Sequence, residues 1–174
     1  VICNVSFVVS KSSADNSGDC SNVSPHRGID CLSIFDDIIR VICPGNRGDE
    51  KPIGGSIANA DPAADYPAAV LALDAKITTS SNSYNSDDFF IDMFETAINS
   101  DEIITSIDFK IPKKSVYKKF RNPASGYAMA GVFIAIFEEG IRVAITGAST
   151  TAFRLHDLEK KLENNFSVDV LNDF

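Results

Sequence analysis

Alternating and continuous apolar patterns in the last third of the chain predict antiparallel strands. Residues 128–137 (AMAGVFIAIF) are apolar at nearly every position, which predicts a buried strand. A Glu-Glu-Gly turn follows, and residues 141–146 (IRVAIT) predict the returning strand of a hairpin. Residues 115–121 predict a further strand, and residues 151–164 (TAFRLHDLEKKLEN) predict an amphipathic helix. This part of the chain therefore predicts three antiparallel strands and one helix.

The middle of the chain mixes helical and extended patterns. Residues 67–79 (PAAVLALDAKITT) begin as a helix and end as a strand, because their β-branched residues gather at the C-terminal end. Residues 89–98 (FFIDMFETAI) predict a short helix that Asp87 or Asp88 would cap. Residues 102–111 alternate as a strand and end at a proline. Helices and antiparallel strands in this order indicate an α+β fold.

The first quarter of the chain carries weaker patterns. Residues 2–10 predict a strand, and residues 11–27 predict a loop rich in Ser, Asn, Asp and Gly. Residues 31–43 (CLSIFDDIIRVIC) place their isoleucines on one helical face, and Pro44-Gly45 would end that helix.

Composition and charge exclude several classes of protein. The chain has 174 residues, of which 44% are hydrophobic and 23% charged, as in ordinary globular domains. Its net charge of −8 repels phosphate backbones, so we expect no nucleic-acid partner. No apolar run approaches the roughly 18 residues that a membrane-spanning helix needs, so we expect no membrane span.

The cysteines favour free thiols over a metal site. They are widely spaced, with no C-x-x-C pair, at positions Cys3, Cys20, Cys31 and Cys43. Zinc and iron–sulfur sites favour closely spaced ligands, so we predict no metal site. The N-terminal residues lack a basic start and a cleavage pattern, so we expect a cytoplasmic protein in a reducing compartment.

The Gly54-Gly55-Ser56 triplet is the first candidate for chemistry. Glycines lack Cβ atoms, so a ligand can lie directly on the backbone. Their N–H groups could then donate to a pyrophosphate, helped by a following helix N-terminus. A tight turn would explain the same glycines, and the triplet alone leaves both interpretations open.

Polar residues follow the triplet in a segment otherwise poor in large side chains. Asn59, Asp61 and Asp65 could meet a nucleotide, because carboxylates near nucleotides commonly accept hydrogen bonds from ribose hydroxyls. Alternatively, Asp61 and Asp65 cap helices, with Pro62 at a first helical position. The residues themselves support these two interpretations equally.

Four ordered blocks across residues 51–166 resemble the FAD-binding medium subunit of molybdenum hydroxylases, the family of aerobic carbon monoxide dehydrogenase and xanthine dehydrogenase. The blocks read IGGSIANADPAADYPAAVLALDAKI, DFFIDMFETAINSDEIITSIDFKIP, YKKFRNPASGYAMAGVFIAI and RVAITGASTTAFRLHDLEKKL. The resemblance implies a PCMH-type α+β flavoprotein fold. Residues 51–111 would form the second FAD-binding subdomain, and residues 112–174 a C-terminal domain of antiparallel sheet plus helix. Residues 1–50 would be a divergent or partial first FAD subdomain.

The resemblance also implies which residues hold FAD. The implied contacts are Ile53, Gly54, Gly55, Ser56, Asn59, Asp61, Asp65, Ile104 and Lys119. Asp65 matches an acidic residue at the adenosine end, and Ile104 matches an apolar residue near the flavin. Lys119 matches a basic residue near the flavin ring, where it would stabilise anionic reduced flavin. Plain strand-core packing for Ile104 and a solvated lysine at 119 are the alternatives.

The implied function is that of an oxidoreductase subunit that relays electrons and has no catalytic residue of its own. Electrons would pass from a large molybdenum-cofactor subunit, through the iron–sulfur clusters of a small subunit, to FAD and an external acceptor. The chain would thus be part of a hetero-oligomer.

Two features of the N-terminal part depart from the family pattern. The family's first glycine-rich loop is not found in residues 1–50, and Asp49-Glu50-Lys51-Pro52 stands where one threonine is expected. The alternative is therefore a truncated, non-catalytic remnant that keeps the fold or a docking surface but binds no flavin.

Overall fold

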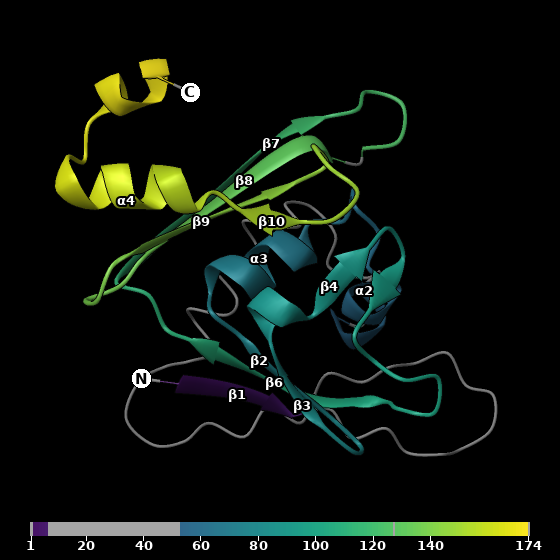
Figure 1. The fold of residues 1–174 in the computed structure, drawn as a ribbon. Coiled ribbons are helices and arrows are strands. Elements are labelled where there is room, and N and C mark those ends of the chain that lie inside the picture. Colours follow the sequence, from purple (N-terminus) through teal and green to yellow (C-terminus); the bar gives the residue numbers. More distant parts are fainter. Residues whose placement is uncertain (1, 7–52, 127, 174) are drawn as a thin grey trace.

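Helix α3 (Tyr66–Ala72) lies between two four-stranded sheets in the computed structural model, which describes residues 2–6, 53–126 and 128–173 (Figure 1). All strand pairs within both sheets are antiparallel. The α+β fold class predicted from the sequence is confirmed.

The first sheet joins the N-terminal strand to the middle of the chain. Its strands, in spatial order, are β1 (Ile2–Ser6), β6 (Ile104–Lys110), β2 (Lys76–Thr79) and β3 (Ser83–Asn85). Strands β2 and β6 pair with Ile77 opposite Ile107, and both side chains are fully buried. The strands predicted within residues 67–79 and 102–111 are therefore present, and residues 2–6 of the strand predicted over residues 2–10 form β1.

The second sheet is an up-and-down meander near the C-terminus. Its strands, in spatial order, are β10 (Phe153–Arg154), β9 (Ile141–Thr146), β8 (Ala128–Ile136) and β7 (Lys114–Arg121). Helix α4 (His156–Asn164) covers its outer face, where Leu158 and Leu162 pack on Val143. A 3₁₀ helix, η2 (Val168–Asp173), follows α4. The predicted strands and hairpin are confirmed in this part of the chain.

The predicted C-terminal helix begins later than expected. Residues 153 and 154 form β10 because they pair with Ile145 and Ala144 of β9, so the helix starts only at His156. Long-range strand pairing thus replaces the first turn of the predicted helix.

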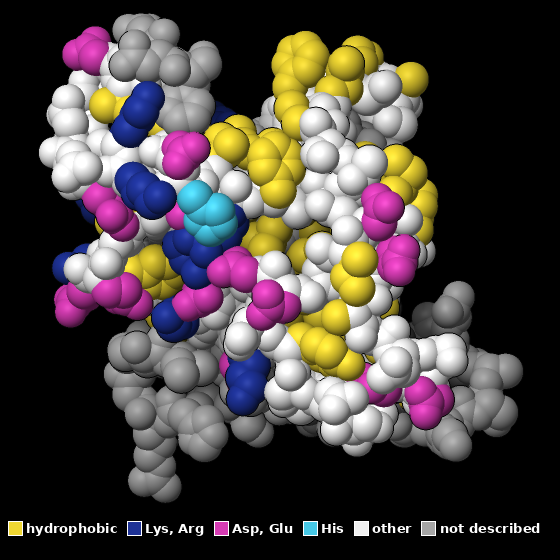
Figure 2. Space-filling model, in the orientation of Figure 1, with side chains coloured by type: hydrophobic (Ala, Val, Ile, Leu, Met, Phe, Trp, Pro, Cys, Tyr) yellow, Lys and Arg dark blue, Asp and Glu magenta, His cyan; other side chains and the backbone are white. Residues whose placement is uncertain are grey.

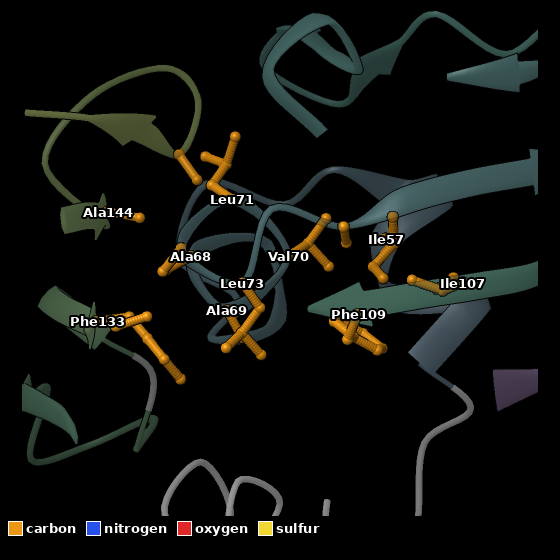
Figure 3. Close-up of a cluster of buried hydrophobic side chains, with 14 of the residues drawn as sticks. Ile57, Ala68, Ala69, Val70, Leu71, Leu73, Ile107, Phe109, Phe133 and Ala144 are labelled. Carbon is orange, nitrogen blue, oxygen red and sulfur yellow. The ribbon is translucent and has the colours of Figure 1, made fainter. Parts of the chain in front are cut away.

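Helix α3 forms the centre of the hydrophobic core. Residues from Pro67 to Ala72 are all buried, because one side of the helix faces each sheet. Figure 3 shows Ala68 toward Phe133 and Ala144 of the second sheet, while Val70 lies on the side of Ile57. Burial on every side explains why this helix is built from alanines, valine and leucine without a polar face.

The helix predicted over residues 89–98 is wrong. This segment instead forms a hairpin of β4 (Phe90–Asp92) and β5 (Glu95–Thr96), after a short 3₁₀ helix, η1 (Ser86–Asp88). Phe94 sits in the left-handed region at φ 57°, and its N–H donates to the distant Ala60 carbonyl at 3.2 Å. This long-range bond and the positive φ fix an extended turn that local sequence does not reveal.

The helix predicted over residues 31–43 and the loop over residues 11–27 lie outside the described residues. None of the helices in the described ranges is long and apolar enough to cross a bilayer.

Candidate functional site

The glycine triplet begins a helix rather than forming a loop. Helix α2 (Ile53–Asn59) contains Gly54, Gly55 and Ser56 in its first turn. The first N–H groups of an α-helix have no intrahelical acceptor, and in α2 they belong to residues 53–55. The glycines therefore lie in the first turn of a helix, and the tight turn considered as the alternative is not formed.

The space around Gly54 does not explain why it is glycine. A Cβ at this position would meet no atom within 4 Å among the described residues. Glycine in a helix interior costs about 1 kcal/mol relative to alanine. A residue that packing does not require and that weakens the helix is typical of a surface that a ligand approaches closely.

Helix α2 is held against the first sheet and α3. Ile57 is fully buried, and α2 lies against β6, on which Ile104 is only 6% exposed. Ile104 is thus a core residue of the strand that supports α2. Asn59 ends α2 with an exposed side chain, and Asp61 accepts a hydrogen bond from the Ala63 N–H at 2.9 Å. Asp61 therefore organises the turn between α2 and α3.

Asp65 and Lys119 are brought together although 54 residues separate them. The Lys119 Nζ donates to Asp65 Oδ2 at 2.6 Å, and both side chains are largely buried at 12% and 15% exposure. The Tyr117 hydroxyl donates to the other oxygen, Asp65 Oδ1. Asp65 stands at the N-cap position of α3 without a side-chain cap bond, so its carboxylate serves β7 instead.

Sequence reasoning missed Tyr117, although a signal for it existed. Tyr117 and Lys119 are two residues apart on β7, so they share one face of the strand. The intervening Lys118 is exposed. The strand period therefore selects Lys119 as the inward-facing lysine and Tyr117 as its neighbour.

A second polar cluster, which we call the ion network, lies where the end of α3 meets strands β6, β9 and β10. Its members are charged side chains from six different places in the fold: Asp74, Asp87, Lys110, Arg142, Arg154 and Glu159. Arg142 bonds Asp74 at 2.8 Å and Asp87 at 2.7 Å, while Arg154 bonds Asp87 at 2.7 Å. Figure 2 shows acidic and basic side chains interleaved next to α4 on this face.

The pKa values of two carboxyl groups of the ion network, Glu159 and Asp74, are lowered from their ordinary values. Burial raises the pKa of Glu159, but hydrogen bonds from Arg154 and from the Val143 N–H outweigh it, so the pKa is lowered. Burial likewise raises the pKa of Asp74, but the hydrogen bond from Lys110 and the charge of Arg142 outweigh burial. The pKa of Asp74 is therefore lowered as well. Both carboxylates are therefore stabilised in their charged form.

A polar cavity borders the ion network. Its lining includes Arg142, Arg154, His156 and Glu159. Arg142 pairs with Asp74 and Asp87, and Arg154 pairs with Asp87 and Glu159, so we assign the cavity no ligand. Within the described part of the chain, no group of three or more His, Cys, Asp or Glu side chains is placed to hold a metal ion, and the cysteine side chains lie outside it.

Comparison with known proteins shows which proteins this chain is similar to. Residues 51–114 match the sequence model of the FAD binding domain in molybdopterin dehydrogenase. The glyceraldehyde dehydrogenase medium chain of Sulfolobus acidocaldarius is 39% identical over 121 residues, which are 63% of this chain and 43% of that protein. The nicotine 6-hydroxylase medium subunit of Paenarthrobacter nicotinovorans is 30% identical over 132 residues, which are 69% of this chain and 45% of that protein. The chain thus spans less than half the length of these relatives.

The fold comparison agrees with the sequence comparison. A chain of carbon monoxide dehydrogenase from Hydrogenophaga pseudoflava superposes with a TM-score of 0.66 at 24% identity, over 79% of this chain and 56% of that one. A chain of the enzyme from Oligotropha carboxidovorans gives 0.64 at 22% identity, over 80% of this chain and 57% of that one. Residues 51–114 therefore match the FAD binding domain found in molybdopterin dehydrogenases, which indicates FAD as the cofactor, and the chain is similar to medium subunits of molybdenum hydroxylases.

Proposed function

We propose that this chain is the FAD-binding electron-transfer subunit of a molybdenum hydroxylase complex. It would take electrons from the iron–sulfur clusters of a small partner subunit and pass them through FAD to an external acceptor. The observation that carries the proposal is the FAD-domain match over residues 51–114, because that range contains α2, Asp65 and Ile104. Bound FAD would supply the redox chemistry, and the chain would position the cofactor and tune its electronics.

The proposed FAD contacts begin with the first turn of α2. Ile53, Gly54 and Gly55 would present backbone N–H groups to the anionic diphosphate, and Ser56 would contact it from the same turn. The open space beside Gly54 supports this assignment. The remaining proposed contacts are the side chains of Asn59, Asp61, Asp65, Ile104 and Lys119. Because Lys119 pairs with Asp65, any charge that it places near the flavin is shared with that carboxylate.

The domain division is part of the same proposal. Residues 51–111 would form the second FAD-binding subdomain, and residues 112–174 the C-terminal flavoprotein domain. The end of the family match at residue 114 supports this boundary. Residues 1–50 would be a divergent or partial first FAD subdomain.

The proposed partners follow from the relatives, whose names describe medium chains or subunits. We propose an iron–sulfur small subunit and a molybdenum-cofactor large subunit in a hetero-oligomer. A cytoplasmic location completes the proposal and rests on the wide cysteine spacing in the sequence.

Stopped-flow absorption of the reconstituted complex tests the relay. The chain is loaded with FAD, mixed with a reduced iron–sulfur partner subunit, and followed by bleaching of the flavin band. We expect bleaching that requires the partner and reverses with an external acceptor. A chain that docks the partner but holds no flavin would contradict the relay and support the non-catalytic remnant instead.

A further inference from the structure

The middle of the segment that follows α2 is hydrogen-bonded to the second sheet. The fully buried Thr146 hydroxyl lies 2.8 Å from the Pro62 carbonyl and 2.6 Å from the Ala64 carbonyl, and it can donate to either. The Gly147 N–H also donates to the Pro62 carbonyl, at 2.8 Å. These bonds join β9 and its following turn to residues 60–65, which we call the clamped segment.

The same segment is bonded to the second sheet at its C-terminal end. Asp65 accepts hydrogen bonds from Tyr117 and Lys119 of β7, each on a separate carboxylate oxygen. Bonds from cationic and neutral donors to one largely buried carboxylate are among the stronger side-chain hydrogen bonds. The clamped segment is therefore fixed by two strands that follow it far along the chain.

Gly131 provides the room that these contacts need. It pairs with Lys119 on one side and with Thr146 on the other, so it lies between the two points of attachment. A Cβ at Gly131 would collide with the Tyr117 hydroxyl and would lie 2.8 Å from the Thr146 methyl group. Glycine at this position is thus required by the packing, unlike glycine at 54.

We infer that Tyr117, Gly131 and Thr146 are positioning residues for flavin, which hold the clamped segment so that α2 and Asp61 keep their places. This inference rests on the proposed function. The clamped segment continues directly from Asn59 at the end of α2, so its position constrains the helix that carries the glycines. All three residues lie beyond the FAD-domain match, which ends at residue 114, so flavin affinity depends on the second sheet as well.

Two conservative variants of the full chain test the clamp, by which we mean the hydrogen bonds from the second sheet and its turn to the clamped segment. Tyr117→Phe and Thr146→Val each remove one hydroxyl donor and retain most of the side-chain volume. Tyr84→Phe is the matched control. The Tyr84 hydroxyl donates to Glu102 Oε2 at 3.1 Å, and neither residue belongs to the clamped segment. Hydrogen exchange of residues 59–66 and Gly147 is measured without ligand, and FAD affinity is measured by quenching of flavin fluorescence.

We expect both variants to speed exchange in the clamped segment and to raise the FAD dissociation constant, each by roughly tenfold, as lost hydrogen bonds of this kind imply. The control should change neither quantity. Unchanged exchange in both variants would overturn the clamp, and faster exchange with unchanged FAD affinity would overturn its role in flavin positioning. If the unaltered chain takes up no FAD, the proposed function fails, while the exchange measurement still decides whether the clamp exists.

Discussion

Glu159 connects three elements through one buried carboxylate. It projects from α4, accepts the Val143 N–H of β9 at 2.8 Å, and receives both a 2.9 Å and a 2.6 Å bond from Arg154 of β10. The two-bond geometry uses the planar guanidinium in a way that a lysine could not. A single residue thus fixes how α4 lies on the second sheet.

Replacing Arg154 with methionine should strongly destabilise the fold. Arg154→Met leaves Glu159, whose side chain is 7% exposed, without its cationic partner. We expect the free energy of unfolding to fall by about 3 kcal/mol, measured by urea denaturation. The matched control is Lys113→Met, whose pair with Glu138 is solvent-exposed and should be worth no more than about 0.5 kcal/mol. Equal effects of the two substitutions would show that the buried pair carries no special stability.

At the scale of elements, α2 combines weak helix-forming residues with a well-fixed position. Two of its seven residues are glycines, yet Ile57 anchors it in the core. The helix therefore depends on tertiary contacts rather than on intrinsic propensity. If its first turn meets a ligand, stability and binding should respond oppositely to a side chain there.

A methyl group at Gly54 should separate these two effects. Gly54→Ala should raise the free energy of unfolding by up to about 1 kcal/mol, because a Cβ meets open space and favours the helix. The same change should weaken FAD binding, measured by fluorescence quenching, because the Cβ occupies the surface proposed for the ligand. Ala58→Gly is the control, since it should lower stability without adding bulk. FAD binding that becomes tighter in Gly54→Ala would argue against this surface.

The accuracy of sequence reasoning also varied by element. Strands β8 and β9 were predictable because their apolar pattern and the Glu-Glu-Gly turn between them are local signals. The hairpin over residues 90–96 was not, since the Phe94 N–H bond to Ala60 depends on a distant segment. Likewise, the sequence suggested Asp65 and Lys119 as site residues, but their pairing with each other appears only in the folded chain.

At the scale of the whole molecule, polar contacts as well as the hydrophobic core hold the two sheets and the segments between them in place. The clamp ties the clamped segment to the second sheet. In the ion network, Asp74 directly after α3 pairs with Lys110 of β6 and Arg142 of β9. Asp87 of η1 pairs with Arg142 of β9 and Arg154 of β10. The two sheets are thus fixed relative to each other by charged groups as well as by α3.

Stability should therefore decrease in acid. The pKa values of Glu159 and Asp74 are lowered in the folded state, so their contribution to stability is fully present above the ordinary carboxyl range. It is lost as the pH falls from about 4.5 through the lowered folded-state values. Urea denaturation between pH 7 and pH 3 should show this decrease, and Arg154→Met should show a smaller one. Stability that stays level or rises toward pH 3 would contradict the assignment.

The visible absorption spectrum of the purified full chain, alone and after incubation with FAD and desalting, tests the central claim most directly. The account predicts a flavin band near roughly 450 nm that remains with the protein after desalting. Gly54→Ala should retain less of this band than the unaltered chain. A colourless protein that keeps no FAD under these conditions would contradict the claim that this chain binds flavin.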